Sequence, residues 1–262
     1  MQHYSWRRVR IGRLPIDAVT LEQAVDAIER LVNDRRGGTV YTPNVDHIMV
    51  AEENPVFRSA YEQVSLSLVD GTPVMWAARL LREPLPEKVS GSDLFDPLIA
   101  RAAERGFRIY LLGGGPGVAE LAATRLKERY PRLNIAGLDA PFIDGDGLAR
   151  NRDEVLQRIT AARPDIVLVA CGAPKSELFC YHNFDELKPA VLVCVGAAID
   201  FAAGTAQRAP RWVSRAGLEW LYRLSREPRR LAYRYLVRDP RFVGVVTREL
   251  FARKSGAGAA SP

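Results

Sequence analysis

Val64-Ser-Leu-Ser-Leu-Val-Asp70-Gly71-Thr72-Pro73 is the stretch around which the rest of this chain can be organised. From Val64 to Val69 apolar and polar side chains alternate, which is the period of a strand that buries one face. Asp70 ends that strand, and Thr72-Pro73 opens a helix that we expect to run to Leu81. We therefore expect Asp70 at the carboxyl end of a strand, where α/β proteins place their chemistry. On local sequence alone, Asp70 could instead cap the helix or start a turn.

The same strand-then-helix order repeats along most of the chain. Expected strands lie at 11–16, 39–42, 64–69, 107–112, 133–138, 164–170 and 190–195, and expected helices at 21–32, 45–53, 57–61, 74–81, 93–105, 118–130 and 148–162. Strands that alternate with helices predict an α/β fold, a Rossmann-like and mostly parallel sheet with helices on both faces. We expect a catalytic core at 1–205, a basic helical appendage at 206–254 and a disordered tail at 255–262.

Composition sets broad bounds on the class of protein. The 262 residues are 47% hydrophobic and 26% charged, which is ordinary for a soluble globular protein. Three cysteines, at 171, 180 and 194, form no tight pair in the sequence and favour a reducing compartment. No apolar run reaches the roughly 18 residues of a membrane-spanning helix. We expect a cytoplasmic protein.

Positive charge is concentrated near the C-terminus. Residues 208–254 hold thirteen basic and four acidic residues, a net charge of +9, although the whole chain carries only +6. Trp212, Trp220, Tyr222, Tyr233 and Tyr235 are interspersed among these arginines. This mixture fits an anionic membrane surface, a nucleic acid, or a solvated basic face over core aromatics, and composition does not separate the three.

Several polar and glycine-rich segments follow predicted strands. Thr42-Pro-Asn44 and Asp70 are expected to border one crevice, where hydroxyl, amide and carboxylate groups suit sugar hydroxyls, although Asn44 could simply cap the next helix. Gly113, Gly114 and Gly115 open a helix, and their N–H groups suit a diphosphate or form a plain turn. They lack the third glycine of the dinucleotide fingerprint, which argues against nicotinamide. We expect this triple glycine to border the Asp70 crevice.

Charged residues in other loops are weaker candidates. Lys88 and Lys175 could neutralise phosphate, or could be solvated. Asp200 follows a strand and could accept hydrogen bonds from a base or ribose. Asp144-Gly-Asp146 has the spacing of a metal-diphosphate site, but we favour a turn because no further ligand lies nearby in the sequence.

Together these motifs resemble the WecG/TagA/CpsF glycosyltransferase family, over roughly residues 10 to 250. The segments that carry the resemblance are Thr42-Pro-Asn44, Val69-Asp-Gly71, Val89-Ser-Gly91-Ser-Asp93-Leu94, Leu112-Gly-Gly114, Gly172-Ala-Pro-Lys175-Ser176-Glu177, Gly196 to Gly204, Arg208-Ala-Pro-Arg-Trp212 and Gly217-Leu-Glu-Trp-Leu-Tyr-Arg-Leu224. The last segment is the most specific, because it is long and ungapped.

The resemblance implies an inverting, metal-independent transferase that needs no cofactor. Such enzymes move a hexose or N-acetylhexosamine from a UDP-sugar to a sugar on undecaprenyl diphosphate, in the synthesis of exopolysaccharides or cell-wall polymers. The work is done at the inner face of the plasma membrane, which the appendage touches while closing over the site. The resemblance places the catalytic base at Asp70. Residues implied to bind substrate are Thr42, Asn44, Lys88, Gly91, Asp93, Gly113, Gly114, Gly115, Lys175, Ser176, Asp200, Arg223 and Arg230.

Two positions depart from the family pattern. Ser176 stands where the family usually has Gln, and Lys88 stands where members often have Arg, so the transferred sugar stays open. The resemblance implies no nucleic-acid partner, and it leaves homo-oligomerisation open. A nucleotide-sugar oxidoreductase and a basic nucleic-acid-binding module are the alternative functions, although neither explains Asp70 beside Thr42 and Asn44.

Overall fold

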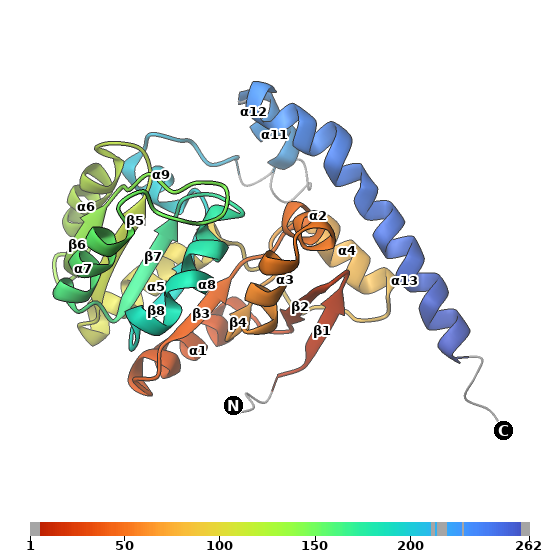
Figure 1. Cartoon of the computed structure of the whole chain (residues 1–262), viewed down its shortest axis with the longest axis horizontal. Helices are drawn as coiled ribbons and strands as arrows, with labels where there is room; N and C mark the ends of the chain where they lie inside the picture. The colour runs from red at the N-terminus through yellow and green to blue at the C-terminus, as the bar shows by residue number, and fades with distance from the viewer. Residues whose placement is uncertain (1–5, 211–212, 214–218, 227, 258–262) are drawn as a thin grey trace.

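The centre of the molecule is a six-stranded sheet in the order β4-β3-β8-β7-β5-β6, in which every neighbouring pair is parallel (Figure 1). The computed structural model describes residues 6–210, 213, 219–226 and 228–257. The strands are β3 (Gly38–Tyr41), β4 (Leu66–Ser67), β5 (Arg108–Gly113), β6 (Asn134–Asp139), β7 (Ile166–Ala170) and β8 (Val191–Cys194). The predicted parallel α/β fold is confirmed.

Helices cover both faces of this sheet. They are α1 (Leu21–Asn33), α2 (Val45–Glu53), α3 (Pro55–Glu62), α4 (Thr72–Leu80), α5 (Gly91–Arg105), α6 (Val118–Arg129), α7 (Arg152–Ala162), α8 (Lys175–Leu187) and α9 (Ala198–Ala203). Along β7, Val167 and Val169 pack with α2, α3, α7 and α8, whereas Ile166 and Leu168 pack with α1, α5, α6 and α9. Because both faces are covered, β7 is an uninterrupted apolar run.

An N-terminal hairpin replaces the single strand predicted at 11–16. It pairs β1 (Arg8–Ile11) with β2 (Leu14–Asp17) in antiparallel register, and Gly12 turns between them with φ +60°. The Arg8 guanidinium binds the Asp17 carboxylate at 2.7 Å, and that carboxylate accepts the Ser67 N–H at 2.8 Å. The hairpin therefore covers the outer flank of the edge strand β4.

The chain segment that leads to Asp70 runs beside β3 beyond the short strand β4. The Leu68 N–H donates to the Tyr41 carbonyl at 2.8 Å, and the Asp70 N–H donates to the Pro43 carbonyl at 2.9 Å. Both faces of this segment are buried, so the expectation of one exposed face was wrong. The reason is that residues 66 and 68 face one core cluster while residues 64 and 69 face the other.

The described part of the appendage is helical and packs against the core. It comprises α11 (Glu219–Arg226), α12 (Pro228–Tyr233), a π-helical turn at Arg234–Arg238, a 3-10 turn at Asp239–Arg241 and α13 (Phe242–Ala257). Phe242, Val245 and Val246 are buried in the cluster that includes α2, α3 and α4. Figure 1 shows α13 running down the flank of the molecule past α2 and α4, and Arg253 donates to the Leu81 carbonyl at 2.9 Å.

The boundary predicted for the disordered tail was partly wrong, because α13 continues three residues past 254, to Ala257. Extension of a helix that is already anchored adds a hydrogen bond for each residue fixed, which favours this continuation. Residues 258–262 lie outside the described part of the chain. In the described part, no helix combines the length and the apolar character needed to cross a bilayer.

Candidate active site

A cavity of about 310 Å³ lies where β3 and β4 end and the appendage meets the core. The core contributes polar groups from three loops, and the appendage contributes three aromatic side chains, an arginine and a second carboxylate. The lining residues are Asn44, Val45, Asp70, Gly71, Thr72, Pro73, Lys88, Trp220, Arg234, Tyr235, Asp239, Phe242 and Val243. Convergence of polar groups in a partly apolar cavity is typical of a ligand site.

Asp70 lies at this cavity and is not the N-cap residue of the following helix. Helix α4 begins at Thr72, and its N-cap is Gly71, which has no side chain that could make a capping hydrogen bond. Gly71 has φ +93°, a conformation that L side chains rarely adopt, and this explains why glycine follows the carboxylate. The Asp70 side chain is half-buried. A half-buried carboxylate that lines a cavity can act as a general base.

Thr42 and Asn44 lie at the end of β3, the strand next to Asp70, but they do different things. The buried Thr42 hydroxyl donates to the Cys194 carbonyl at 3.4 Å, which joins β3 to β8, and Thr42 does not line the cavity. Asn44 caps α2, which confirms the capping interpretation, and it also lines the cavity, where sugar binding stays a prediction. Pro43 links them to Asp70, because its carbonyl accepts the Asp70 N–H.

The start of α5 holds Lys88, Gly91 and Asp93. The N-cap is Ser90, so α5 begins two residues before the predicted start at 93, because Asp93 at the third helical position closes a capping box with Ser90. The Lys88 amino group, which lines the cavity, donates to Asp93 Oδ2 at 2.5 Å, and Arg208 binds the other oxygen. Burial by itself would raise the pKa of Asp93, but hydrogen bonds from Lys88, Ser90 and Arg208 lower it well below its usual range.

The triple glycine lies farther along the same sheet edge. Strand β5 is four positions from β4, which at about 4.8 Å per strand is about 19 Å. The glycine loop packs against α9, since a side chain on Gly114 would lie 3.9 Å from Ile199, and Asp200 belongs to the first turn of that helix. None of Gly113, Gly114, Gly115 and Asp200 lines the cavity. The prediction that the triple glycine borders the Asp70 cavity is therefore not met.

Comparison with known proteins agrees with these motifs. The family model described as "Glycosyl transferase WecG/TagA/CpsF family" matches residues 9–256. The chain belongs to this glycosyltransferase family.

Two relatives cover most of the glycosyltransferase chain. A protein of Bacillus spizizenii (strain ATCC 23059 / NRRL B-14472 / W23) is 32% identical over 216 residues, which is 82% of this chain and 80% of the relative. One of Bacillus subtilis (strain 168) is 30% identical over 241 residues, which is 91% of each. Both are named N-acetylglucosaminyldiphosphoundecaprenol N-acetyl-beta-D-mannosaminyltransferase. Family membership sets aside the oxidoreductase and the nucleic-acid-binding module.

Lys175 and Ser176 of the glycosyltransferase lie away from the cavity and have partners of their own. Lys175 donates to the Ile143 carbonyl at 2.7 Å, and the buried Ser176 hydroxyl accepts the Cys171 N–H at 3.0 Å. In the neighbouring loop, Asp144 Oδ1 accepts the N–H groups of residues 146 and 148 at 3.0 and 2.9 Å. The turn predicted for Asp144-Gly-Asp146 is thus confirmed.

Gly91 makes a close packing contact at the end of β8. A Cβ atom on Gly91 would lie 2.7 Å from the Val195 carbonyl carbon and oxygen, so Gly91 allows the start of α5 to approach β8.

Two of the cysteines meet in the core. The sulfur atoms of Cys180, in α8, and Cys194, in β8, are 3.7 Å apart. The three cysteines are free, and this contact joins α8 to β8, which the separation of the two residues along the chain does not reveal.

The side chains of Arg223 and Arg230 lie outside the described part of the chain, as does Trp212, so their predicted roles stay predictions. Among the described residues of the appendage, Arg234 and Asp239 line the cavity. Burial raises the pKa of Asp239, although the charges of Arg234 and Arg238 oppose that rise.

Sequence reasoning missed the arginine pair formed by Arg234 and Arg238, for which the sequence holds only a weak signal. Arg234 and Arg238 are four residues apart, and α2 carries acidic residues that can receive them. Arg234 Nη1 lies 3.2 Å from Asp46 Oδ2, and Arg238 binds Asp46 Oδ1. Asp46 is only 3% exposed. These contacts hold the appendage against α2 at the mouth of the site.

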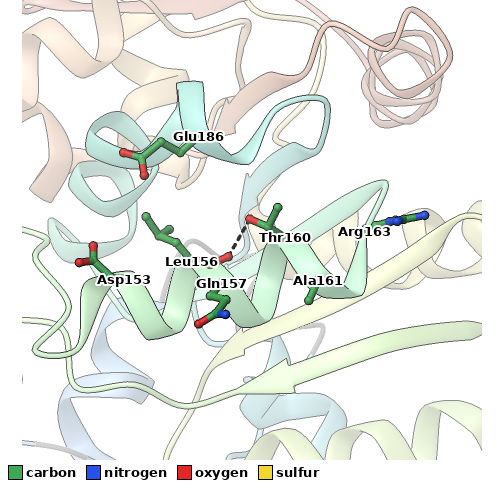
Figure 2. A pocket seen from close by; sticks show the side chains of 7 residues that line it. All are labelled: Asp153, Leu156, Gln157, Thr160, Ala161, Arg163 and Glu186. Carbon is green, nitrogen blue, oxygen red and sulfur yellow. Dashed lines mark hydrogen bonds between the residues drawn. The ribbon is translucent and has the colours of Figure 1, made fainter.

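A second hollow, of about 730 Å³, lies beside α7 and α8 (Figure 2). Its lining is Asp153, Leu156, Gln157, Thr160, Ala161, Arg163 and Glu186. It contains none of the predicted site residues, and it lies on a helical flank rather than at the carboxyl ends of the strands. We therefore place the active site of the glycosyltransferase at the smaller cavity.

Proposed function

We propose that this glycosyltransferase moves a hexose or N-acetylhexosamine from a UDP-sugar to a sugar carried on a polyprenyl diphosphate, with inversion at the anomeric carbon. Family membership supports the reaction class, and the names of the two Bacillus relatives support a lipid-linked N-acetylglucosaminyl acceptor. The observation that carries the proposal is the placement of Asp70 in a cavity that an appendage rich in arginine helps to form.

In the proposed mechanism, Asp70 acts as the general base. It takes the proton of the acceptor hydroxyl while that oxygen forms a bond to the anomeric carbon of the donor. The bond from that carbon to the diphosphate breaks in the same step, and UDP leaves with the electron pair. A single displacement of this kind inverts the configuration and forms no covalent sugar–enzyme intermediate. General-base catalysis typically contributes about 10²- to 10⁴-fold in rate.

The charge that grows on UDP is stabilised by cations of the chain and needs no metal in this proposal. Lys88 and Arg234 already lie at the cavity, and Arg223 and Arg230 stay predictions for the same role. Asp144, the first carboxylate of the metal-like spacing, is occupied by backbone N–H groups. Full activity after exhaustive dialysis against a chelator would support this part, and restoration by a divalent cation alone would contradict it.

The donor has to extend beyond the cavity if the triple glycine holds its diphosphate or nucleoside. The distance of about 19 Å between the ends of β4 and β5 means that such a ligand crosses the ends of β3, β8 and β7. Gly91 packs against Val195 just after β8 and would border this path, Asp93 would act through the cavity residue Lys88, and Asp200 would lie at the far end near the glycine loop. The Thr42 hydroxyl joins β3 to β8 under this path and would keep the ends of the two strands together.

The appendage is proposed to dock on the anionic inner face of the plasma membrane. It exposes Tyr233, Leu236, Val237 and Phe251, each more than half accessible, on helices that also carry arginines. Apolar side chains flanked by arginines suit a headgroup region. Flotation with vesicles should therefore require anionic lipid, and the L236S/V237S variant should float less while remaining folded. Equal flotation with neutral vesicles would contradict the electrostatic part.

The decisive experiment measures transfer to a short-chain polyprenyl-diphosphate sugar with a panel of UDP-sugars. Asp70→Asn should lower turnover by about 10²- to 10⁴-fold and leave the affinity for UDP within about threefold of wild type. Asp239→Asn removes the other carboxylate of the cavity and is the matched control. If Asp239→Asn abolishes turnover while Asp70→Asn does not, the base is misassigned. If no UDP-sugar is a donor, the proposed function is wrong.

A further inference from the structure

The side-chain oxygen of Asn44 has partners from both the core and the appendage. It accepts the backbone N–H of His47 at 3.4 Å and Arg234 Nη2 at 3.2 Å, and it lies 2.8 Å from His47 Nδ1. Among the described residues, no hydrogen bond uses the Asn44 amide nitrogen. One end of this carboxamide is therefore saturated while the residue still lines the cavity.

These partners fix which way the carboxamide faces. A backbone N–H and a guanidinium can only donate, so the atom that faces both of them has to be the oxygen. His47 Nδ1 lies 2.8 Å from that oxygen and 3.4 Å from the backbone N–H of Asn44, and its tautomer decides which of the two it bonds, so the orientation of the carboxamide rests on the backbone N–H of His47 and on Arg234. The amide N–H₂ is consequently the end left for a ligand.

His47 is itself held from behind by the core. Its Nε2 lies 3.3 Å from Glu177 Oε1, and both side chains are less than 10% exposed. The rings of Phe57 and Tyr61 lie 6.0 and 6.5 Å from the imidazole. Packing and the contact with Glu177 thus leave little freedom to the ring beside Asn44.

Arg234 approaches Asn44 from the appendage and is equally restrained. Its guanidinium binds Asp46 Oδ2 at 3.2 Å, and it lies 5.3 Å from the ring centroid of Tyr235 and 3.8 Å from Asp239. Only 23% of the side chain is exposed. One planar group therefore joins the buried Asp46 and the cavity residue Asn44.

We propose that Arg234 is a positioning residue, which holds the Asn44 carboxamide so that its N–H₂ donates to an oxygen acceptor of the bound sugar beside Asp70. This inference rests on the proposed function of the same cavity. It assigns to the appendage a part in building the site, because Asn44 is fully oriented only when Arg234 is docked. The acceptor atom is a hydroxyl or acyl carbonyl oxygen, since both accept from an amide.

Asn44→Asp is the sharpest test, because it separates capping from donation. Aspartate caps a helix as well as asparagine does, and its oxygens can still receive His47 and Arg234. It lacks the N–H₂ group, so we expect kcat/KM to fall about 10- to 100-fold while the Tm stays within about 2 °C. Activity within threefold of wild type, at the pH optimum of each protein, would overturn the proposal.

The link between Arg234 and Asn44 is tested by a double-mutant cycle in kcat/KM. Arg234→Ala and Asn44→Ala should each cost about 10- to 100-fold, and the double variant should cost little more than the worse single variant. Arg234→Lys keeps the positive charge but loses the planar guanidinium that can bind Asp46 and Asn44 together, and it provides a milder variant in case the alanine form unfolds. Additive losses would overturn the link.

Two other arginines provide matched controls for docking. Arg241 pairs at 2.7 Å with Glu53, which lies on α2 like Asp46, and among the described residues its hydrogen bonds do not include one to Asn44. The kcat/KM of Arg241→Ala should therefore stay within twofold of wild type. Arg238→Ala removes the other contact to Asp46, and a loss as large as that of Arg234→Ala would mean that docking alone matters. If wild type transfers no sugar, the proposed function fails by itself. Additive Tm shifts in the Asn44 and Arg234 cycle would then overturn the positioning role.

Discussion

Phe242→Ala should detach the appendage from the core without unfolding the sheet. Phe242 is 6% exposed, and it packs in the same cluster as Val245 and Val246 at the start of α13. The remaining contacts of the appendage with α2 include ion pairs such as Arg241 with Glu53, which has both partners more than half exposed. An ion pair of that exposure stabilises little, so docking rests on the apolar anchor together with the contacts of Arg234 and Arg238 to the buried Asp46.

The size of the effect follows from the burial of the ring. Truncation of a buried Phe to Ala costs about 3 to 5 kcal/mol. We expect α13 to open while the sheet stays folded, so that this cost falls on the docking equilibrium rather than on global unfolding. At about 1.4 kcal/mol per factor of ten, even 3 kcal/mol raises the open population about 100-fold.

Limited trypsin digestion reports this population, since Arg241, Arg248 and Arg253 adjoin the anchor. When opening is fast relative to cleavage, the cleavage rate follows the open fraction, and we expect it to rise about 100-fold in Phe242→Ala. Phe251→Ala, on the same helix and 66% exposed, is the matched control and should cleave like wild type. Unchanged cleavage of Phe242→Ala, or an equal acceleration in both variants, would refute the reasoning.

Three further predictions concern single groups. Asp93→Asn should lose about 1 to 2 kcal/mol of stability at pH 7, because its pKa is lowered in the folded state. This stabilisation is complete above the unfolded pKa near 3.9 and is lost as pH falls toward the lower folded pKa, so urea titrations should converge in acid, and a constant gap would contradict the assignment. Gly91→Ala should cost about 1 to 3 kcal/mol, since the new methyl group would meet Val195 at 2.7 Å, whereas Gly115→Ala meets only an ordinary contact and should leave the Tm unchanged. Burial raises the pKa of Cys171 to about 12, so alkylation at pH 8 should be slow in the native protein and fast in urea, and rapid native labelling would disprove this.

The elements that were predictable carry their signals locally. Helix α2 has the predicted bounds, because Asn44 caps its start and Asn54-Pro55 ends it. Helix α1 likewise follows its capping residue Thr20, which forms a capping box with Gln23. The parallel sheet followed from the alternation of apolar runs with amphipathic helices. Asp70 was placed correctly at the sheet edge because a strand period stops there.

What the sequence did not reveal depends on contacts between distant segments. The order of the strands separates the triple glycine from Asp70, although both follow strands in the same manner. Glu177, His47 and Arg234 meet around Asn44 from three separate elements, and their spacing along the chain carries no sign of it. In the appendage other arginines share the four-residue spacing of Arg234 and Arg238, so this signal is weak and only the contact with the buried Asp46 distinguishes the pair.

The N-terminal hairpin has a consequence for handling this protein. An uncovered edge strand offers unpaired N–H and C=O groups to the strands of other molecules. Here the edge strand is β4, which leads to Asp70. Asp17 and Arg8 occupy those groups along residues 64 to 67. Deletion of the first seventeen residues, or fusion of a tag that distorts them, would thus expose the edge of β4. The expected result is aggregation into inactive oligomers rather than a partial loss of turnover.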